Sequence, residues 1–313
     1  MSIIEKAVGK LEREKGARPE GNEAKEHRPV GGEDATAHAQ PSEAGEAAAP
    51  VEPEYVELPL DKLAERGMIT PDKPRSHIAE EFRIIKRPLL QNLAGEGAAE
   101  MPENINLIMV TSALAGEGKT FSAVNLAISM AMELDKTVLF VDADVSKAAA
   151  ATLLGISSKR RGLIDLLEDP SIEMRDVMLH TNIPNLRILT AGRLHDRATE
   201  LLASEAMHQL MIDLSRRYPD RVIVFDSPPL LQSTEAVVLA NLMGQVVFIV
   251  AAEQTSQGAV LEAIRLFKQE QIVGMVLNKS RRRISAGYGY GYGYGYGYGY
   301  GYGNSRVEPE EAG

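Results

Sequence analysis

The sequence contains no cysteine and no tryptophan, and its charge is strongly one-sided. Without cysteine the chain forms neither disulfides nor thiolate metal sites, which fits a reducing compartment. The formal net charge is −10, which argues against a general nucleic-acid binder because such proteins carry basic surfaces. We therefore expect no nucleic-acid partner.

Long apolar runs are also scarce. The longest stretch, residues 237–252, is interrupted by Asn241, Gly244 and Gln245, so it is interpreted as helix, turn and buried strand rather than a membrane span. The first residues mix both charge signs every few positions and lack the apolar core of a secretory signal. We expect a cytoplasmic protein that is recruited to the inner membrane through a partner.

Composition divides the chain into five segments. They are a short helix at 1–15, a disordered linker at 16–54, a helical extension at 55–103, a core domain at 104–280 and a disordered tail at 281–313. The linker has too few large apolar side chains to offset the entropy of ordering it. The first segment has one apolar face, so it is either a docking helix for a partner or a frayed terminus.

Apolar strand patterns and amphipathic helix patterns alternate through the core domain. The strands at 137–141 and 221–225 are apolar without polar alternation, as a parallel sheet covered on both faces requires. A single helix is predicted over residues 197–217, and Pro88 predicts a kink or break in the helix over 77–93. The fold class is α/β, with a doubly wound, mostly parallel sheet.

Residues 109–120, read as MVTSALAGEGKT, lie where a strand pattern passes into a helix pattern. The backbone N–H groups of such a loop, together with the helix N-terminus, form an anion site. Lys119 is placed to reach the β- and γ-phosphates of a nucleotide, and the Thr120 hydroxyl to hold Mg²⁺. Ala113 stands where the usual motif has glycine, so this is a deviant Walker sequence.

Two predicted strands end in carboxylates. Asp142 and Asp144 follow one strand, and Asp226 follows another. The carboxyl ends of parallel strands form the ligand-binding edge of a doubly wound sheet, so we expect all three beside the phosphate loop. Phosphoryl transfer needs phosphate positioning, a metal to spread charge and a group that orients or deprotonates the nucleophile. The pattern predicts a Mg²⁺-dependent phosphoryl-transfer site.

Residues 287–303 form an uninterrupted Gly-Tyr repeat. Alternating glycine prevents a stable packed element, which leaves the tyrosine hydroxyls as candidate phosphate acceptors. A low-complexity segment that drives self-association through aromatic contacts is the alternative. The candidate acceptors are Tyr288, Tyr290, Tyr292, Tyr294, Tyr296, Tyr298, Tyr300 and Tyr302.

Together these motifs resemble the bacterial tyrosine kinases, P-loop autokinases that govern capsule and exopolysaccharide export. The resemblance rests on the phosphate loop, the D-x-D motif at Asp142, the D-x-x-P motif at Asp226 and the tyrosine cluster, and it covers roughly residues 76–303. The chain is most similar to the subgroup linked to exosortase-associated polysaccharide loci. The resemblance implies a P-loop NTPase fold and a kinase that phosphorylates its own tail in trans.

The resemblance also implies roles by position, with ATP and Mg²⁺ as cofactors. Asp142 would act as the base toward a tyrosine hydroxyl, while Asp144 and Asp226 would act on the metal. The implied catalytic residues are Lys119, Asp142 and Asp144. The implied metal-binding residues are Thr120, Asp144 and Asp226. The implied ATP-binding residues are Gly116, Glu117, Gly118, Lys119, Thr120, Phe121 and Asn278.

In the family, a Glu-x-x-Arg-x-x-Arg helix joins unphosphorylated subunits into a ring. Glu80, Arg83 and Lys86 match that register, and because lysine cannot make the forked contact of arginine we expect a weaker or altered ring. Ser146, followed by Lys147, stands where the family usually has a basic residue. The implied partners are a transmembrane polysaccharide co-polymerase or chain-length protein as activator, and a phosphotyrosine phosphatase.

A non-kinase ATPase switch of the partitioning and cell-division-positioning type shares this fold and these acidic positions. Such proteins usually carry a second lysine in the loop, where this chain has Leu114, and they lack a tyrosine tail. Both features favour the kinase, and the ATPase switch stays as the alternative. A scaffold that binds ATP without catalysis is a third possibility.

Overall fold

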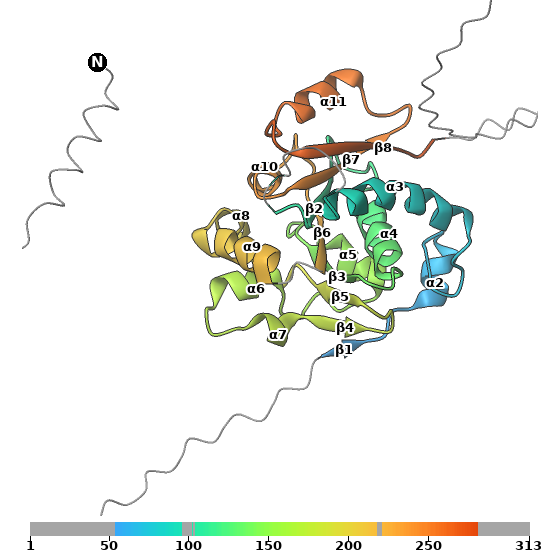
Figure 1. Ribbon diagram of the computed structural model, residues 1–313. Coiled ribbons are helices and arrows are strands. Elements are labelled where there is room, and N and C mark those ends of the chain that lie inside the picture. The colour runs from blue at the N-terminus through green and yellow to red at the C-terminus, as the bar shows by residue number, and fades with distance from the viewer. Residues whose placement is uncertain (1–53, 96–101, 103, 218–220, 281–313) are drawn as a thin grey trace, which may run out of the picture. The chain divides into compact units, whose positions relative to one another are not determined.

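The computed structural model describes residues 54–95, 102, 104–217 and 221–280. Figure 1 shows these residues as a sheet flanked by helices. The predicted N-terminal helix and linker, up to residue 53, and the tyrosine tail lie outside the described residues.

An eight-stranded sheet with the order β1-β4-β5-β3-β6-β2-β7-β8 organises the described chain. Every adjacent pair is parallel except β4 with β5, which confirms the predicted mostly parallel sheet. The strands are β1 (Tyr55–Val56), β2 (Leu107–Ser112), β3 (Thr137–Asp142), β4 (Leu179–Thr181), β5 (Leu186–Leu189), β6 (Arg221–Asp226), β7 (Gln245–Ala251) and β8 (Ile272–Asn278).

Helices connect the strands and cover both faces of the sheet. They are α2 (Leu60–Glu65), α3 (His77–Leu93), α4 (Lys119–Ala131), α5 (Ala149–Leu154), α6 (Leu163–Glu168), α7 (Met174–Val177), α8 (Ala198–Leu202), α9 (Glu205–Arg217), α10 (Thr234–Ala240) and α11 (Gln257–Ile264). Within the described ranges, no helix combines the length and apolar character needed to cross a bilayer.

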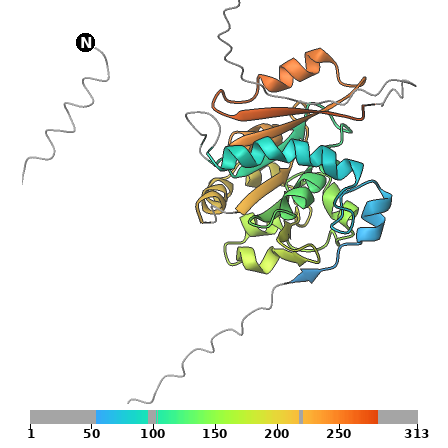
Figure 2. The same cartoon turned by 45° about the vertical axis from the view of Figure 1, so that its right-hand side comes forward.

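Alternate residues of the central strand β2 enter two separate cores. Ile108 and Val110 pack with apolar side chains of α3 and α4 on one face, while Leu107 and Met109 pack with those of α6, α9 and α10 on the other. Figure 2 shows α3 and α4 side by side on the first face. A strand with period-two side chains can fill two cores only when both faces are covered, so the sheet is doubly wound.

Of the kink or break predicted at Pro88, the break does not occur, and the prediction of one helix over 197–217 was wrong. α3 continues through Pro88 without ending, because Phe82 and Leu89 are buried on either side of it and hold the helix on the core. The predicted single helix over 197–217 is divided into α8 and α9. Ser204 accepts a hydrogen bond from Met207 N at 3.3 Å and so acts as a helix cap that starts α9.

The segment predicted as a helical extension begins with a strand of the same sheet. β1 pairs with β4, and Asn182 accepts a hydrogen bond from Leu58 N at 2.9 Å and donates one to Leu58 O at 3.0 Å. Residues 55–58 are thereby fixed to a part of the chain more than a hundred positions away. This extension is therefore continuous with the core domain at its edge.

Candidate functional site

The phosphate loop is held open by two left-handed glycines. Gly116 has a φ of 83°, and Gly118, which precedes the first residue of α4, has a φ of 99°. Only residues without a side chain adopt such angles readily. Ser122 N is the first amide of α4 that donates to a carbonyl oxygen four residues earlier, that of Gly118, at 2.9 Å. The preceding amides of α4 are therefore directed at the loop, as an anion site requires.

The buried Glu117 fixes the shape of the loop from within. Its carboxylate accepts hydrogen bonds from Leu114 N at 2.7 Å and from the Thr255 hydroxyl. Leu114, which distinguishes this loop from one with a second lysine, thus contributes its backbone N–H to the loop's own structure. Because Glu117 is only 3% exposed and its carboxylate already has two donors, it braces the loop.

The end of β8 braces the same loop from outside. Asn278 donates from its side-chain nitrogen to Glu117 O at 2.8 Å, and Lys279 donates from its ammonium to Gly116 O at 2.6 Å. A Cβ on Gly118 would lie 2.2 Å from the Asn278 amide nitrogen, so glycine is needed there for close approach as well as for its φ. Asn278, predicted to contact the nucleotide base, lies against the phosphate loop.

The three predicted carboxylates meet at one edge of the sheet. Asp142 at the end of β3 is paired in register with Asp226 at the end of β6, and Asp226 is in turn paired with Val110 of β2, shortly before the loop. Asp142, Asp144 and Asp226 are at most 3% exposed. The sequence prediction that they gather beside the phosphate loop agrees with this geometry.

These carboxylates are short of hydrogen-bond donors. Asp142 accepts from Asp144 N at 3.2 Å through one oxygen, and Asp144 accepts from the Ser146 hydroxyl at 2.9 Å. The other oxygen of Asp142 and both oxygens of Asp226 are buried without any partner among the described residues. Buried acceptors of this kind are costly unless a ligand completes them.

Burial and mutual repulsion shift the titration of these groups. Burial, reinforced by Asp226 and Asp144, raises the pKa of Asp142 well above its usual value. Burial also raises the pKa of Asp226 to about 7; the nearby Thr120 hydroxyl opposes this, Asp144 adds to it and Lys119 opposes it. Such raised values mark a site that lacks positive charge.

Lys119, the first residue of α4, is the cation that acts on this cluster electrostatically. Its side chain is 7% exposed; burial lowers its pKa, Asp226 and Asp144 oppose that shift, and the nearby Lys147 adds to it. Thr120 follows on the same helical turn and is partly buried, as is Phe121. The loop, the lysine and the carboxylates thus form one continuous polar edge.

The donor set fits a hard divalent cation. The unpartnered oxygens of Asp142 and Asp226 are hard ligands, and Mg²⁺ commonly takes one or two carboxylates together with phosphate oxygens and waters. The described part of the chain has no cluster of three or more His, Cys, Asp or Glu side chains suited to a metal. Waters and the oxygens of a bound nucleotide would complete the coordination of a cation here.

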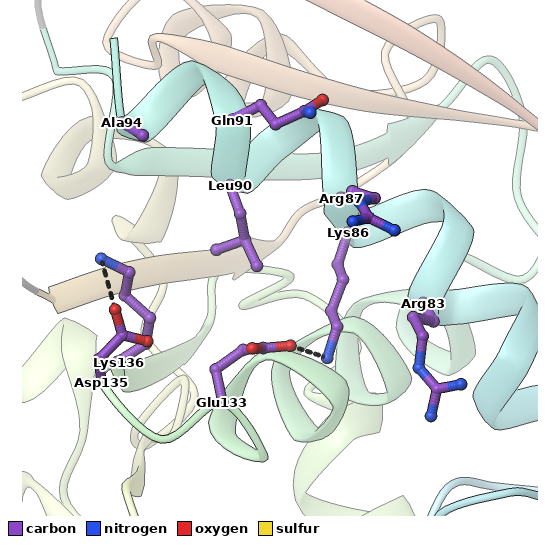
Figure 3. A pocket seen from close by; sticks show the side chains of 9 residues that line it. All are labelled: Arg83, Lys86, Arg87, Leu90, Gln91, Ala94, Glu133, Asp135 and Lys136. Carbon is purple, nitrogen blue, oxygen red and sulfur yellow. Dashed lines mark ion pairs between the residues drawn. The ribbon is translucent and has the colours of Figure 1, made fainter. Parts of the chain in front are cut away.

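The predicted oligomerisation residues lie on α3, but they do not face the same way. Lys86 is 7% exposed; its ammonium donates to Ser129 O at 2.5 Å and pairs with Glu133 at 2.6 Å, as Figure 3 shows. Arg83 is exposed; it pairs with Glu80 and donates to Pro74 O at 3.2 Å. Lys86 is therefore occupied within its own chain, whereas Glu80 and Arg83 remain at the surface.

Several contacts at this site were not foreseen from the sequence. Thr255 and Lys279 brace the phosphate loop, and Gln232 accepts a hydrogen bond from Ala115 N at 3.2 Å. No local motif marks Thr255 or Gln232, because their partners lie more than a hundred positions away. Lys279 directly follows Asn278, and that adjacency was the available signal. The eight candidate acceptor tyrosines lie outside the described residues.

Comparison with known proteins agrees with the geometry. A family model described as "AAA domain" matches residues 105–277. Tyrosine-protein kinase YwqD of Bacillus subtilis is 28% identical over 216 residues, which are 68% of this chain and 86% of that protein.

Two solved structures resemble the fold. The kinase domain of Escherichia coli tyrosine kinase ETK superposes with a TM-score of 0.59 at 26% identity, covering 76% of this chain and 94% of that one. The chimerical protein CapA2B2 superposes with a TM-score of 0.55 at 25% identity, covering 69% and 97%. The chain belongs to the AAA domain family, with a P-loop NTPase fold, and its relatives within that family are bacterial tyrosine-protein kinases.

Proposed function

We propose that the protein is an ATP-dependent protein-tyrosine autokinase that phosphorylates its own Gly-Tyr tail. The observation that carries this proposal is the set of unpartnered buried oxygens of Asp142 and Asp226 beside a preformed phosphate loop. A site that only stabilised the fold would have its buried carboxylates satisfied. The names of its relatives and the tyrosine repeat support a tyrosine as the acceptor.

In this proposal the loop amides and Lys119 hold the β- and γ-phosphates of ATP. Thr120, Asp144 and Asp226 would hold Mg²⁺, which when bound spreads the charge of the transferring phosphoryl group. Asp142, whose pKa burial raises, is suited to accept the proton of the incoming tyrosine hydroxyl. We assign Asn278, which donates to the phosphate loop, and Phe121, which follows Thr120, to binding of the nucleoside.

The tail is long enough to be a substrate in trans. The roughly 35 residues that follow β8 would reach on the order of 100 Å if extended, which is enough to enter a neighbouring subunit's site. Each phosphotyrosine adds about −1.5 to −2 charges, so full modification would add on the order of −12 or more. We propose that unphosphorylated chains assemble, with Glu80 and Arg83 of α3 at the contact, and that phosphorylation separates them.

The relatives support a proposal for the cellular role and partners. We propose that the kinase regulates exopolysaccharide or capsule export at the inner membrane, with a transmembrane chain-length or co-polymerase protein as activator. A phosphotyrosine phosphatase would reset the tail. The solved chimera CapA2B2 is named for two components, which supports a two-component arrangement here.

The test uses the full chain with labelled ATP and Mg²⁺, read by anti-phosphotyrosine detection and by ADP release. We expect tyrosine label on the wild type and at least about a hundredfold less on Lys119→Met, since positioning groups of this kind contribute several kcal/mol. Lys136→Met is the matched control, because Lys136 precedes β3 and so lies at the opposite edge of the sheet. ADP release by the wild type without tyrosine label would reject the kinase in favour of the ATPase switch.

Assembly is tested separately by size-exclusion chromatography before and after incubation with ATP. We expect a large unphosphorylated species that falls to smaller ones as the tail is modified. An unchanged size with a fully phosphorylated tail would contradict the proposed separation while leaving the kinase activity intact.

A further inference from the structure

Beside the carboxylates lies a second polar feature that no step above uses. It is an open groove of about 630 Å³ whose lining includes Lys147, Lys159 and Arg193. We call it the cationic groove. Its remaining lining residues are neutral, so it holds three cations and no carboxylate in a chain whose net charge is −10.

The fold places the cationic groove directly beside the catalytic edge. Lys147 follows the end of β3 and Arg193 follows the end of β5, and these two strands are parallel neighbours. Ser146, which also lines the groove, donates its hydroxyl to Asp144 at 2.9 Å. Lys147 is close enough to Lys119 for the two charges to interact. A peptide whose acceptor reached Asp142 would therefore continue into this groove.

The cations of the groove are available for an anion. The side chains of Lys147 and Lys159 are exposed and make no ion pair or hydrogen bond with other residues that the structure describes. Arg193 is held in place by the buried Asp165, which pairs with its Nε at 2.5 Å and accepts from its backbone N at 3.1 Å. This arrangement holds a guanidinium whose side chain is 62% exposed.

The tail has the spacing that such a groove would use. Its tyrosines alternate with glycine, so neighbouring tyrosines on an extended strand lie on the same side about 6.5–7 Å apart. A phosphotyrosine brings about −1.5 to −2 charges and three acceptor oxygens, which suit lysine and arginine side chains. An unmodified tyrosine offers no charge to these cations.

We propose that the cationic groove binds phosphotyrosine already formed on the tail and thereby presents the next tyrosine to the site. Phosphorylation then proceeds along one tail rather than being scattered among many. This inference rests on the proposed autokinase function, but the binding it requires does not depend on catalysis.

The first experiment measures binding without ATP. Phosphatase-treated full chain is titrated into fluorescent Gly-Tyr nonapeptides, one unmodified, one with a central phosphotyrosine and one with glutamate at that place, followed by fluorescence anisotropy. We expect the phosphopeptide to bind about tenfold or more tightly than either of the others. Equal affinity for all three peptides, or for the phosphotyrosine and glutamate peptides, would overturn the proposal.

Variants locate the binding. Lys159→Glu should remove the preference for the phosphopeptide, and its exposed side chain makes folding of the variant straightforward to verify by thermal melting. Lys136→Glu, with the same charge change at the opposite edge of the sheet, should keep the preference. A preference that survives Lys159→Glu would place the phosphate elsewhere and overturn the assignment of the groove.

The second experiment follows autophosphorylation by intact-protein mass. The wild type should show heavily phosphorylated chains while unmodified chains persist, whereas Lys159→Glu should pass through one and two phosphates in sequence. Sequential addition in the wild type would contradict the proposal. If no tyrosine label forms at all, the autokinase function fails, and the peptide titration still decides whether the groove binds phosphotyrosine.

Discussion

Two buried aspartates of this protein have opposite surroundings. Asp165 on α6 is 2% exposed and accepts hydrogen bonds from Gly162 N, from Arg193 N and from Arg193 Nε. Asp226 at the end of β6 is fully buried, and neither of its oxygens has a hydrogen-bond partner in the part of the chain that the structure describes. Burial would raise the pKa of Asp165, but its bonds from Arg193 and Gly162 lower it, whereas burial raises the pKa of Asp226 to about 7.

The difference separates a structural carboxylate from one reserved for a ligand. Donors around Asp165 replace the water it lost on folding, so its charge stabilises the loops that carry Gly162 and Arg193. The nearby Thr120 hydroxyl and Lys119 only partly offset the water lost by Asp226, so its charge destabilises the unliganded fold. An unfavourable buried charge of this kind is expected at a site that binds a cation and phosphates.

The largest effect on stability is expected from replacing Asp165, whose carboxylate is fully hydrogen-bonded. Asp165→Asn should lower the free energy of unfolding by about 3 kcal/mol, because two backbone donors and a guanidinium lose their charged acceptor. Urea denaturation at pH 7 measures it. The lowered pKa of Asp165 means that its contribution is present above pH 3.8 and is lost as the pH falls through its folded value. A variant as stable as the wild type at pH 7 would contradict this account.

Replacing Asp226, whose buried charge lacks hydrogen-bond partners among the described residues, should instead raise the stability. Asp226→Asn should raise the free energy of unfolding of the nucleotide-free protein by about 2 kcal/mol at pH 8. The rise of the Asp226 pKa to about 7 sets an upper limit of about 4 kcal/mol for this gain. The unmet hydrogen bonds of the new amide offset part of it. The same variant should lose tyrosine labelling.

The pH dependence gives this second prediction a check of its own. Below pH 3.8 the carboxyl is neutral in both folded and unfolded chains, so the part of the gain that comes from removing the charge should vanish there, which leaves the cost of the amide's unmet bonds. Between pH 3.8 and about 7 the carboxyl of Asp226 is ionised in the unfolded chain but still largely neutral in the folded one. The stability gained by Asp226→Asn should therefore grow with pH in this range and level off above pH 7. Thermal melts across this range measure it, and a gain that is constant with pH would rule out the charge as its cause.

A smaller effect is expected where a buried carboxylate loses one of two donors. Thr255→Val should lower stability by about 1 kcal/mol, because Glu117 keeps its bond from Leu114 N but loses the hydroxyl. ATP affinity should fall several-fold as the phosphate loop loosens. Thr255→Ser, which keeps the hydroxyl, is the matched control, and a loss of affinity equal in both variants would exclude the hydrogen bond as its cause.

An effect of similar size is expected at Lys86. Its partner Glu133 has a side chain that is 38% exposed and can return to water, so Lys86→Met should cost about 1 kcal/mol, mostly from the lost bond to Ser129 O. Arg83→Met, on the exposed part of α3, should leave stability unchanged and weaken assembly. Urea denaturation and size-exclusion chromatography separate the two. A Lys86→Met variant that disassembles at full stability would show that this lysine reaches another subunit.

Features with strong local signals agreed closely with the sequence analysis. The bounds predicted for α3 are those of the structure, residues 237–252 pass through the predicted helix, turn and buried strand, and the phosphate loop and acidic strand ends lie where their motifs placed them. Short elements were missed because their existence depends on distant partners: β1 has two residues and forms only by pairing with β4. Ser204 caps α9 and so divides the single predicted helix over 197–217, and an amphipathic pattern does not reveal such a cap.

The sequence by itself determined the chemistry available to this protein: a phosphate loop, carboxylates at strand ends and a dense row of tyrosines. Hydrophobic periodicity and loop composition are local properties, so the chain carries them without folding. Only the tertiary structure decided which charges are satisfied. Asp165 and Arg193 meet across 28 positions and Lys86 and Ser129 across 43, whereas the Asp226 oxygens remain without a partner among the described residues, and no local pattern distinguishes these three outcomes.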